Sequence, residues 1–253
     1  MAESTTAPAL PAHTALAVVF QVREDVLQVL LWERAREPFR GAWSLPGGTL
    51  GSGETLEQSI LLHLATKVDV REVAHLEQLG TWSDPGRHPG RRELATAYLG
   101  LVPLGIDPRV PTDTRWHPVE ALPPTAFDHG EIVLAGRERL RGKLSYSNVG
   151  FALAPATFTL AELSDVYEAA LGYDVSATNL KRVLLRRARS SPLESVAPTV
   201  PPEVAPPRSS ASEAGRSRSP TRSPFYGHPG RSRVRRVVDT PGDIVGRRNF
   251  EWR

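Results

Sequence analysis

The stretch from Leu45 to Val70, LPGGTLGSGETLEQSILLHLATKVDV, joins a glycine-rich loop to a segment with helical spacing of apolar residues. Carboxylates three or four positions apart on such a helix share one face and can hold the Mg²⁺ that pyrophosphate hydrolysis needs. Here that face carries His63, Thr66 and Lys67. Because the ammonium of Lys67 would repel a divalent cation, this helix face does not suit a Mg²⁺ site.

A second group of residues suits contact with DNA. Leu180, Val183 and Leu184 are spaced as the buried stripe of a helix, which places polar side chains on the opposite face. The predicted DNA contacts there are Thr178, Asn179, Lys181, Arg182 and Arg186. Arg can read guanine edges in bidentate fashion, whereas Lys mostly contacts phosphates. The alternative is a packing or dimerisation helix pair with a solvated basic face.

Charge is distributed unevenly along the 253 residues. Residues 181–253 hold sixteen Lys or Arg against six Asp or Glu, whereas residues 1–180 hold 15 against 22. The basic part predicts a polyanionic partner, with Arg235 and Arg236 as further DNA contacts; a solvated, disordered tail is the alternative. The sequence has no cysteine, and its first apolar run, TALAVVF, is too short to span a bilayer. We therefore expect a soluble cytoplasmic protein without membrane contact.

The order of local patterns predicts an α/β unit followed by a helical one. TALAVVFQV and DVLQVLLWE form an expected hairpin around a turn at Arg23 and Glu24, and two further strand-like runs flank the loop DPGRHPGRR. The expected parts are a loose tail (1–13), an α/β domain (14–124), a connecting helix (125–150) and a C-terminal domain (151–253) with a disordered insertion at about 190–224.

The C-terminal domain opens with signals for two short helices. Thr159 and Glu162 form a capping box, and Gly172 stops the first helix. Ser176 can cap the second. Two short helices joined by a tight turn predict a helix-turn-helix. The run RVRRVVDTPGDIVGRRNFEWR regains strand character and predicts a terminal hairpin.

The segment GGTLGSGETLEQSILLHLATKVDV resembles a Nudix box. The matching positions are Gly48, Glu54, Leu64 and Val70. The departures, which remove the arginine, the glutamates and the glycine of the pattern, are Leu62, His63, Thr66, Lys67 and Asp69. The resemblance implies an α/β/α sandwich whose loop is kept and whose metal-binding glutamates are lost, so we expect neither an enzyme nor a bound metal or cofactor.

The surrounding segments LLWERAREPFRGAWSLPGG and WSDPGRHPGRRELATAYLGLVP are similar to those of Nudix domains that recognise ADP-ribose. Arginine donors bind diphosphate oxygens in pairs, and tryptophan offers a face for adenine. The expected ligand-binding residues are Arg34, Arg40, Trp43, Gly47, Gly48, Trp82, Arg87 and Arg91. Taken singly, each could instead be a core aromatic or a solvated arginine.

The order of parts resembles the Nudix-related transcriptional regulators of NAD metabolism. This resemblance implies a winged helix-turn-helix, ADP-ribose as effector, and genes for NAD synthesis or salvage as targets. Because one recognition helix buries little surface, we also expect a homodimer on a palindromic double-stranded DNA operator. Because the pocket is kept without its catalytic groups, we expect a repressor that ADP-ribose releases from DNA. One alternative is a divergent hydrolase of ADP-ribose or another nucleotide with relocated metal ligands such as Glu54, Glu57 and Glu93. Another is an RNA-associated Nudix-fold scaffold.

Overall fold

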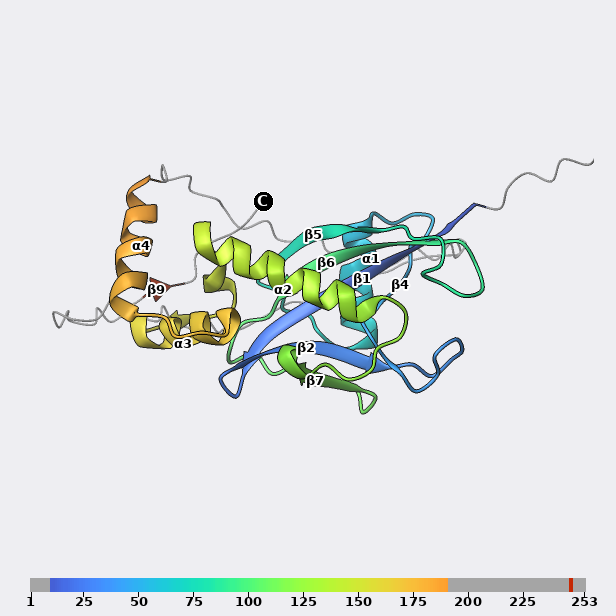
Figure 1. Ribbon diagram of the computed structural model, residues 1–253, viewed down its shortest axis with the longest axis horizontal. Helices are drawn as coiled ribbons and strands as arrows, with labels where there is room; N and C mark the ends of the chain where they lie inside the picture. The colour runs from blue at the N-terminus through green and yellow to red at the C-terminus, as the bar shows by residue number, and fades with distance from the viewer. Residues whose placement is uncertain (1–9, 191–245, 248–253) are drawn as a thin grey trace, which may run out of the picture.

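The computed structural model describes residues 10–190 and 246–247. Figure 1 shows a twisted sheet with α2 lying across one face, and α3 and α4 beyond one end of the sheet. The strands are β1 (Ala12–Arg23), β2 (Val26–Glu33), β3 (Trp43–Ser44), β4 (Gly47–Thr49), β5 (His75–Trp82), β6 (Glu93–Leu101), β7 (Thr114–Pro118), β8 (Thr157–Phe158) and β9 (Gly246–Arg247). The helices are α1 (Leu56–Lys67), η1 (Val119–Ala121), α2 (His129–Tyr146), η2 (Val149–Ala152), α3 (Leu160–Leu171) and α4 (Ala177–Ser190).

The main sheet is mixed, with β1 and β6 at its centre. These two strands pair in parallel, and the sheet order is β3-β2-β1-β6-β5. Along β1, only the last part, from Phe20 to Arg23, pairs with β2. The segment from Thr14 to Leu16 pairs with β4 on the same edge of β1. β2 therefore diverges from β1, and the glycine-rich strand β4 takes its place along the first half of β1.

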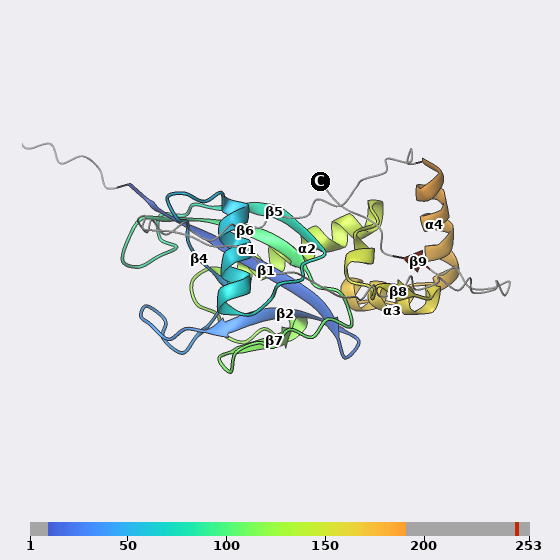
Figure 2. The ribbon, with the colours of Figure 1, turned by 180° about the vertical axis from the view of Figure 1, so that it is seen from behind.

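The two faces of β1 contribute to two apolar clusters, because successive side chains of a strand point in opposite directions. Ala15, Ala17 and Val19 pack with residues of α1. Leu16, Val18 and Phe20 belong to the cluster that contains the buried residues of α2. α2 lies in front of the sheet in Figure 1, and α1 lies in front in Figure 2, which shows the opposite side. The sheet is thus covered on both faces, and the predicted α/β class is confirmed.

The hairpin between β1 and β2 forms as expected, but its turn lies one residue later. Arg23 pairs with Val26 and belongs to β1, so the turn consists of Glu24 and Asp25. Both have positive φ, +51° and +59°, as the central residues of a type I′ turn require. This turn matches the twist of the flanking strands, whereas a turn at Arg23 would remove the last pair of the ladder.

The helix pair also forms where the sequence predicts it. The capping box of Thr159 and Glu162 is present at α3, and Gly172 ends that helix in the left-handed conformation. Ser176 Oγ accepts a hydrogen bond from Asn179 N and caps α4. Leu163, Val166, Tyr167 and Ala170 are buried as the spacing indicates. The described part of the terminal segment, β9, pairs antiparallel with β8. The complete winged helix-turn-helix stays a prediction, because the rest of residues 191–253 lies outside the described residues.

The helix pair shares the apolar cluster of the sheet. Leu163 and Leu180 of α3 and α4 belong to the same buried cluster as Phe20 of β1 and Leu140 of α2. The predicted boundary at residue 151 therefore falls inside a continuous core. α2 and the cluster around it join the sheet to the helix pair without an intervening linker.

Candidate functional site

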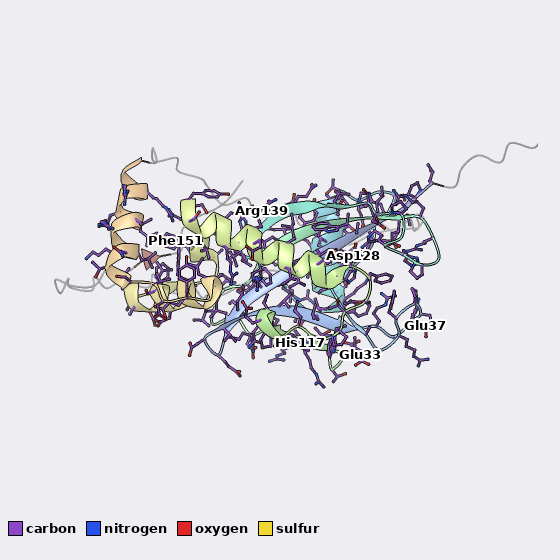
Figure 3. All side chains as sticks on the ribbon, viewed as in Figure 1. Glu33, Glu37, His117, Asp128, Arg139 and Phe151 are labelled. Carbon is purple, nitrogen blue, oxygen red and sulfur yellow. The ribbon has the colours of Figure 1, made fainter. Side chains whose placement is uncertain are left out.

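A cavity of about 580 Å³ opens where β2 diverges from β1, beside β4 and the start of α2. Its charged and aromatic lining consists of Trp32, Arg34, Arg36, Lys67, His88, Arg91, Glu93, Phe127 and His129. Figure 3 shows Asp128 at the start of α2, at the same end of the molecule as Glu33 and Glu37 and far from Phe151 beside α3. Four Lys or Arg side chains and one Glu line the cavity, so its charge favours an anion.

Gly47 and Gly48 line this cavity, Gly47 against β1 and Gly48 against the end of α1. A Cβ atom added to Gly47 would lie 2.2 Å from the carbonyl oxygen of Ala15. One added to Gly48 would lie 2.6 Å from His63 Nε2 and 2.7 Å from Lys67 Nζ. Neither position has room for a side chain without movement of its neighbours, so the glycines let the loop lie against both elements.

α1 begins at a capping box formed by Thr55 and Gln58, and its cavity-facing end carries Lys67. Lys67 Nζ donates a hydrogen bond of 2.6 Å to the carbonyl oxygen of Gly47. Thr66 instead donates to Leu62 O within its own helix. Burial lowers the pKa of Lys67 below its usual range.

These groups do not fit a Mg²⁺ ion. Magnesium requires oxygen ligands, whereas the residues at this end of α1 present an ammonium and an imidazole toward the loop. Glu54 is turned to the loop itself, where it accepts a hydrogen bond from Gly51 N. Among the described residues, no group of three or more His, Cys, Asp or Glu is placed to hold a metal ion.

A buried ion-pair network forms the wall of the cavity beside α2. Arg87 donates from Nε and Nη2 to the two carboxylate oxygens of Asp128, at 3.0 and 2.8 Å, and from Nη1 to Glu93 at 3.2 Å. Arg91 donates to the other oxygen of Glu93, and Thr14 donates to the first. Burial alone would raise the pKa of Glu93, but the hydrogen bonds from Arg91 and Thr14 hold it below its usual value. Glu93 is thus a charged acceptor that fixes three neighbours.

His129, the first residue of α2, is fully buried against the cavity floor. Its Nδ1 accepts a hydrogen bond of 3.0 Å from Leu45 N. Burial lowers the pKa of His129 from 6.5 to about 3. The imidazole is therefore neutral in the folded protein, and it ties the start of α2 to the loop that precedes β4.

This burial predicts a pH dependence of stability. Below about pH 6.5 the unfolded chain protonates His129 and the folded protein does not, so the free energy of unfolding should fall as the pH drops from about 6.5 toward 3. The contribution approaches about 1.4 kcal/mol per pH unit. In His129→Asn, Oδ1 can still accept from Leu45 N, but the titration is gone. Urea unfolding between about pH 7 and pH 5 should show a flatter profile for the variant. Identical profiles would contradict this prediction, since every other histidine is shared.

Two residues that line the cavity, Arg34 and His88, pack against the ring of Phe127. The guanidinium carbon of Arg34 lies 4.7 Å from the ring centroid, and His88 stacks at 5.4 Å. Arg34 also donates from Nε to Pro38 O. Phe127 has a positive φ of +52°, which turns the chain sharply just before α2. The ring therefore holds the side chains of Arg34 and His88, both of which line the cavity.

The structure brings together half of the residues expected to bind ligand. Arg34, Gly47, Gly48 and Arg91 line the cavity. The other four lie elsewhere: Arg40 is exposed, Trp43 packs edge-on against His117, Trp82 packs on the apolar cluster, and Arg87 is committed to its carboxylates. A ligand role for these eight residues stays a prediction.

The sequence analysis did not select Trp32, Phe127 and His129 for this cavity. In the sequence Trp32 cannot be distinguished from an ordinary core aromatic residue of a strand. In the structure its indole N–H donates to Leu45 O, and its ring centroid lies 5.8 Å from Lys67 Nζ. Phe127 and His129 could have been selected from the run FDH, because it begins a predicted helix and the first turn of a helix is a common anion-binding position.

α4 presents the polar face that the sequence predicts. Thr178, Asn179, Arg182 and Arg186 are exposed, and Lys181 is partly exposed. Arg182 donates to Asn179 Oδ1 at 3.0 Å, which holds both side chains on this face. Arg235 and Arg236 lie outside the described residues. The face thus carries three basic side chains, those of Lys181, Arg182 and Arg186, while Leu180 of the same helix is buried.

Arg187, the residue after Arg186, points away from this face and toward α2. Its guanidinium donates to three backbone carbonyl oxygens at the end of that helix, those of Leu144, Ser145 and Ser147. The last carbonyls of a helix lack partners within the helix, and a cation there is favoured by the helix dipole. α4 is therefore attached directly to the C-terminal end of α2.

Comparison with known proteins agrees with this arrangement. Residues 11–135 match the NUDIX domain family. The chain is 27% identical over 182 residues to the "ADPR responsive transcriptional repressor NtrR" of Acinetobacter baylyi, covering 69% of this chain and 72% of that protein. It is 29% identical over 127 residues to an ADP-ribose pyrophosphatase of Methanocaldococcus jannaschii, covering 48% of this chain and 72% of that protein.

Among solved structures, NrtR of Shewanella oneidensis is similar over both the sheet and the helix pair. It is 35% identical with a TM-score of 0.64, covering 69% of this chain and 85% of that one. Its complex with a 27mer DNA gives 33% identity, the same TM-score, and coverage of 69% and 83%. None of the helices in the described part of this chain has the length and apolarity to cross a membrane. The chain belongs to the NrtR-type family of Nudix-related transcriptional regulators.

Proposed function

We propose that the protein is a DNA-binding repressor in which ADP-ribose occupies the basic cavity and releases the operator. In this proposal residues 14–124 sense the ligand, 125–150 connect, and 151–253 form a winged helix-turn-helix that binds DNA. The regulated genes serve NAD synthesis or salvage. The proposal rests on likeness to a repressor described as ADPR responsive and to a relative crystallised with DNA.

The observation that carries the proposal is the attachment of α2 at both ends. Its first residue, His129, is hydrogen-bonded to the loop at the cavity, and its last turn is held by Arg187 of α4. Phe127, which precedes the helix, contacts Arg34 of the cavity, and Asp128 is bonded to Arg87, which shares Glu93 with the cavity residue Arg91. A ligand that engages Arg34 or Arg91 therefore acts on the start of α2, and the bonds of Arg187 transmit a movement of α2 to α4.

The DNA surface in this proposal is the exposed face of α4, with Arg182 reading a base and Lys181 and Arg186 contacting phosphates. One such helix buries little surface on its own. We therefore include a homodimer that places two recognition helices on a palindromic operator, one helical turn or a multiple of it apart.

Reciprocal binding is the test. If ADP-ribose favours the DNA-free form by about 1–3 kcal/mol, saturating ADP-ribose should weaken operator binding by about 5- to 150-fold. Saturating operator DNA must then weaken ADP-ribose binding by the same factor. Calorimetric titrations of ADP-ribose with and without operator, and of operator with and without ADP-ribose, measure both factors. Equal ligand affinity in the two states would eliminate sensing.

A divergent hydrolase is the second candidate, favoured by the likeness to an ADP-ribose pyrophosphatase. Its test is product formation from ADP-ribose in the presence of Mg²⁺. Because the cavity presents Lys67 where a metal would need carboxylates, we expect turnover well below about 1 per second, the lower end of ordinary enzymes. Turnover at that rate or above would favour the enzyme and remove the signal that the repressor needs.

A further inference from the structure

Lys67 lies against the glycine-rich loop of the cavity, and its hydrogen bond goes to a neutral carbonyl oxygen. Arg91 is paired with Glu93, and Arg34 lies over Phe127 and donates to Pro38 O. Within the part of the chain that the structure describes, no carboxylate lies within ion-pair distance of Lys67 Nζ, and its hydrogen bond goes to Gly47 O. A partly buried ammonium is thus held at the cavity without charge compensation.

The surroundings of the ammonium hold it in place and leave donors free. The carbonyl oxygen of Gly47 and the ring of Trp32, whose centroid is 5.8 Å away, both attract a cation. The bare Cα of Gly48 provides the space, since a Cβ there would lie 2.7 Å from Nζ. An ammonium has three N–H groups, so up to two remain to face the cavity after the bond to Gly47.

In a hydrolase of this fold, a divalent cation held beside such a loop neutralises the phosphates. Here a side-chain cation lies against the loop carbonyl, at the end of the helix whose carboxylates would have held the metal. We infer that Lys67 is a built-in cation that binds the diphosphate of the ligand directly, so that the cavity takes a nucleoside diphosphate derivative without Mg²⁺. This inference rests on the proposed function and adds how the diphosphate of the ligand is bound.

Burial of the ammonium supports the assignment. Burial lowers the pKa of Lys67 because desolvation disfavours the charged ammonium. A diphosphate would supply a counter-charge with short, charge-assisted hydrogen bonds. Arg34 and Arg36, which line the same cavity, are placed to share the remaining anionic oxygens.

Calorimetric titration of the full chain with ADP-ribose, in EDTA and again in Mg²⁺, tests the inference. Wild-type affinity should be the same in both buffers. Lys67→Met should lower it by about 10- to 100-fold in both, the range expected for one charge-assisted hydrogen bond. The matched control is Arg71→Met, which removes one positive charge just beyond α1 from an exposed side chain paired with Asp69 and should leave affinity unchanged. Lys67→Glu should bind more weakly still in EDTA and regain affinity with Mg²⁺.

The outcomes separate the inference from the proposed function. Equal affinity of Lys67→Met and wild type, or a wild-type affinity that requires Mg²⁺, overturns the inference and leaves the repressor proposal standing. A wild-type chain that binds no ADP-ribose in either buffer overturns both. The comparison of EDTA with Mg²⁺ uses the wild-type chain alone, so a Mg²⁺ requirement overturns the inference even if Lys67→Met does not fold.

Discussion

Arg87→Met should lower the free energy of unfolding by about 3–5 kcal/mol, the usual cost of breaking a buried ion pair from one side. The Arg87 side chain is 2% exposed and bonds both oxygens of Asp128 and one oxygen of Glu93. Methionine fills much of the volume but leaves Asp128, 16% exposed, without its guanidinium. Urea denaturation monitored by tryptophan fluorescence measures the loss.

Arg91→Met is the control for this prediction, since it removes another guanidinium from the same carboxylate. Arg91 is 52% exposed, and Glu93 keeps Arg87 and Thr14 when it is lost. The expected cost is about 1 kcal/mol or less, as for exposed ion pairs. Equal costs for the two variants would mean that the network is not buried as described.

Arg182→Ala should weaken operator binding by about 1–3 kcal/mol, or roughly 5- to 150-fold, and relax the preference at one base position. The reason is that Arg182 is exposed at the centre of the α4 face and held there by Asn179. Competition between operator and random duplex in a fluorescence-anisotropy titration gives the specificity ratio at each salt concentration.

Lys181→Ala provides the comparison on the same helix. As a phosphate contact it should weaken operator and random DNA alike and reduce the salt slope by about 1, while the specificity ratio stays constant. A specificity ratio unchanged in Arg182→Ala would show that α4 does not read bases through this residue, whatever the affinity.

Local signals predicted the helix pair and the hairpin well. The capping box of Thr159, the stop at Gly172 and the cap at Ser176 depend on neighbours within a few residues, so sequence alone contains their cause. The alternation of side chains between the two faces of β1 likewise follows from the pleat of a strand. The turn after β1 lies one residue later than predicted, because Asp25 as well as Glu24 adopts the left-handed conformation.

The cavity was predicted only in part, because its contacts join distant segments. The carboxylates that occupy Arg87 lie 6 and 41 residues away, and nothing near Arg87 in sequence distinguishes it from a solvated loop arginine. Trp43 and Trp82 were plausible stacking surfaces, but both pack on the core. Conversely, the sequence indicated only that Lys67 is unsuited to binding a metal. Its hydrogen bond to Gly47 O depends on the packing of β4 beside the end of α1, which joins residues 20 positions apart.

α2 has the geometry of a lever arm in the proposed repressor. Its 18 residues form one uninterrupted helix, about 27 Å long at 1.5 Å per residue. A tilt of about 5° at the His129 end displaces the Tyr146 end by about 2 Å. Hydrogen bonds to base edges tolerate errors of only a few tenths of an ångström around about 2.9 Å. In a repressor built this way, a rearrangement at the cavity too slight to disturb the core is large enough, at the far end, to take Arg182 out of register with its base.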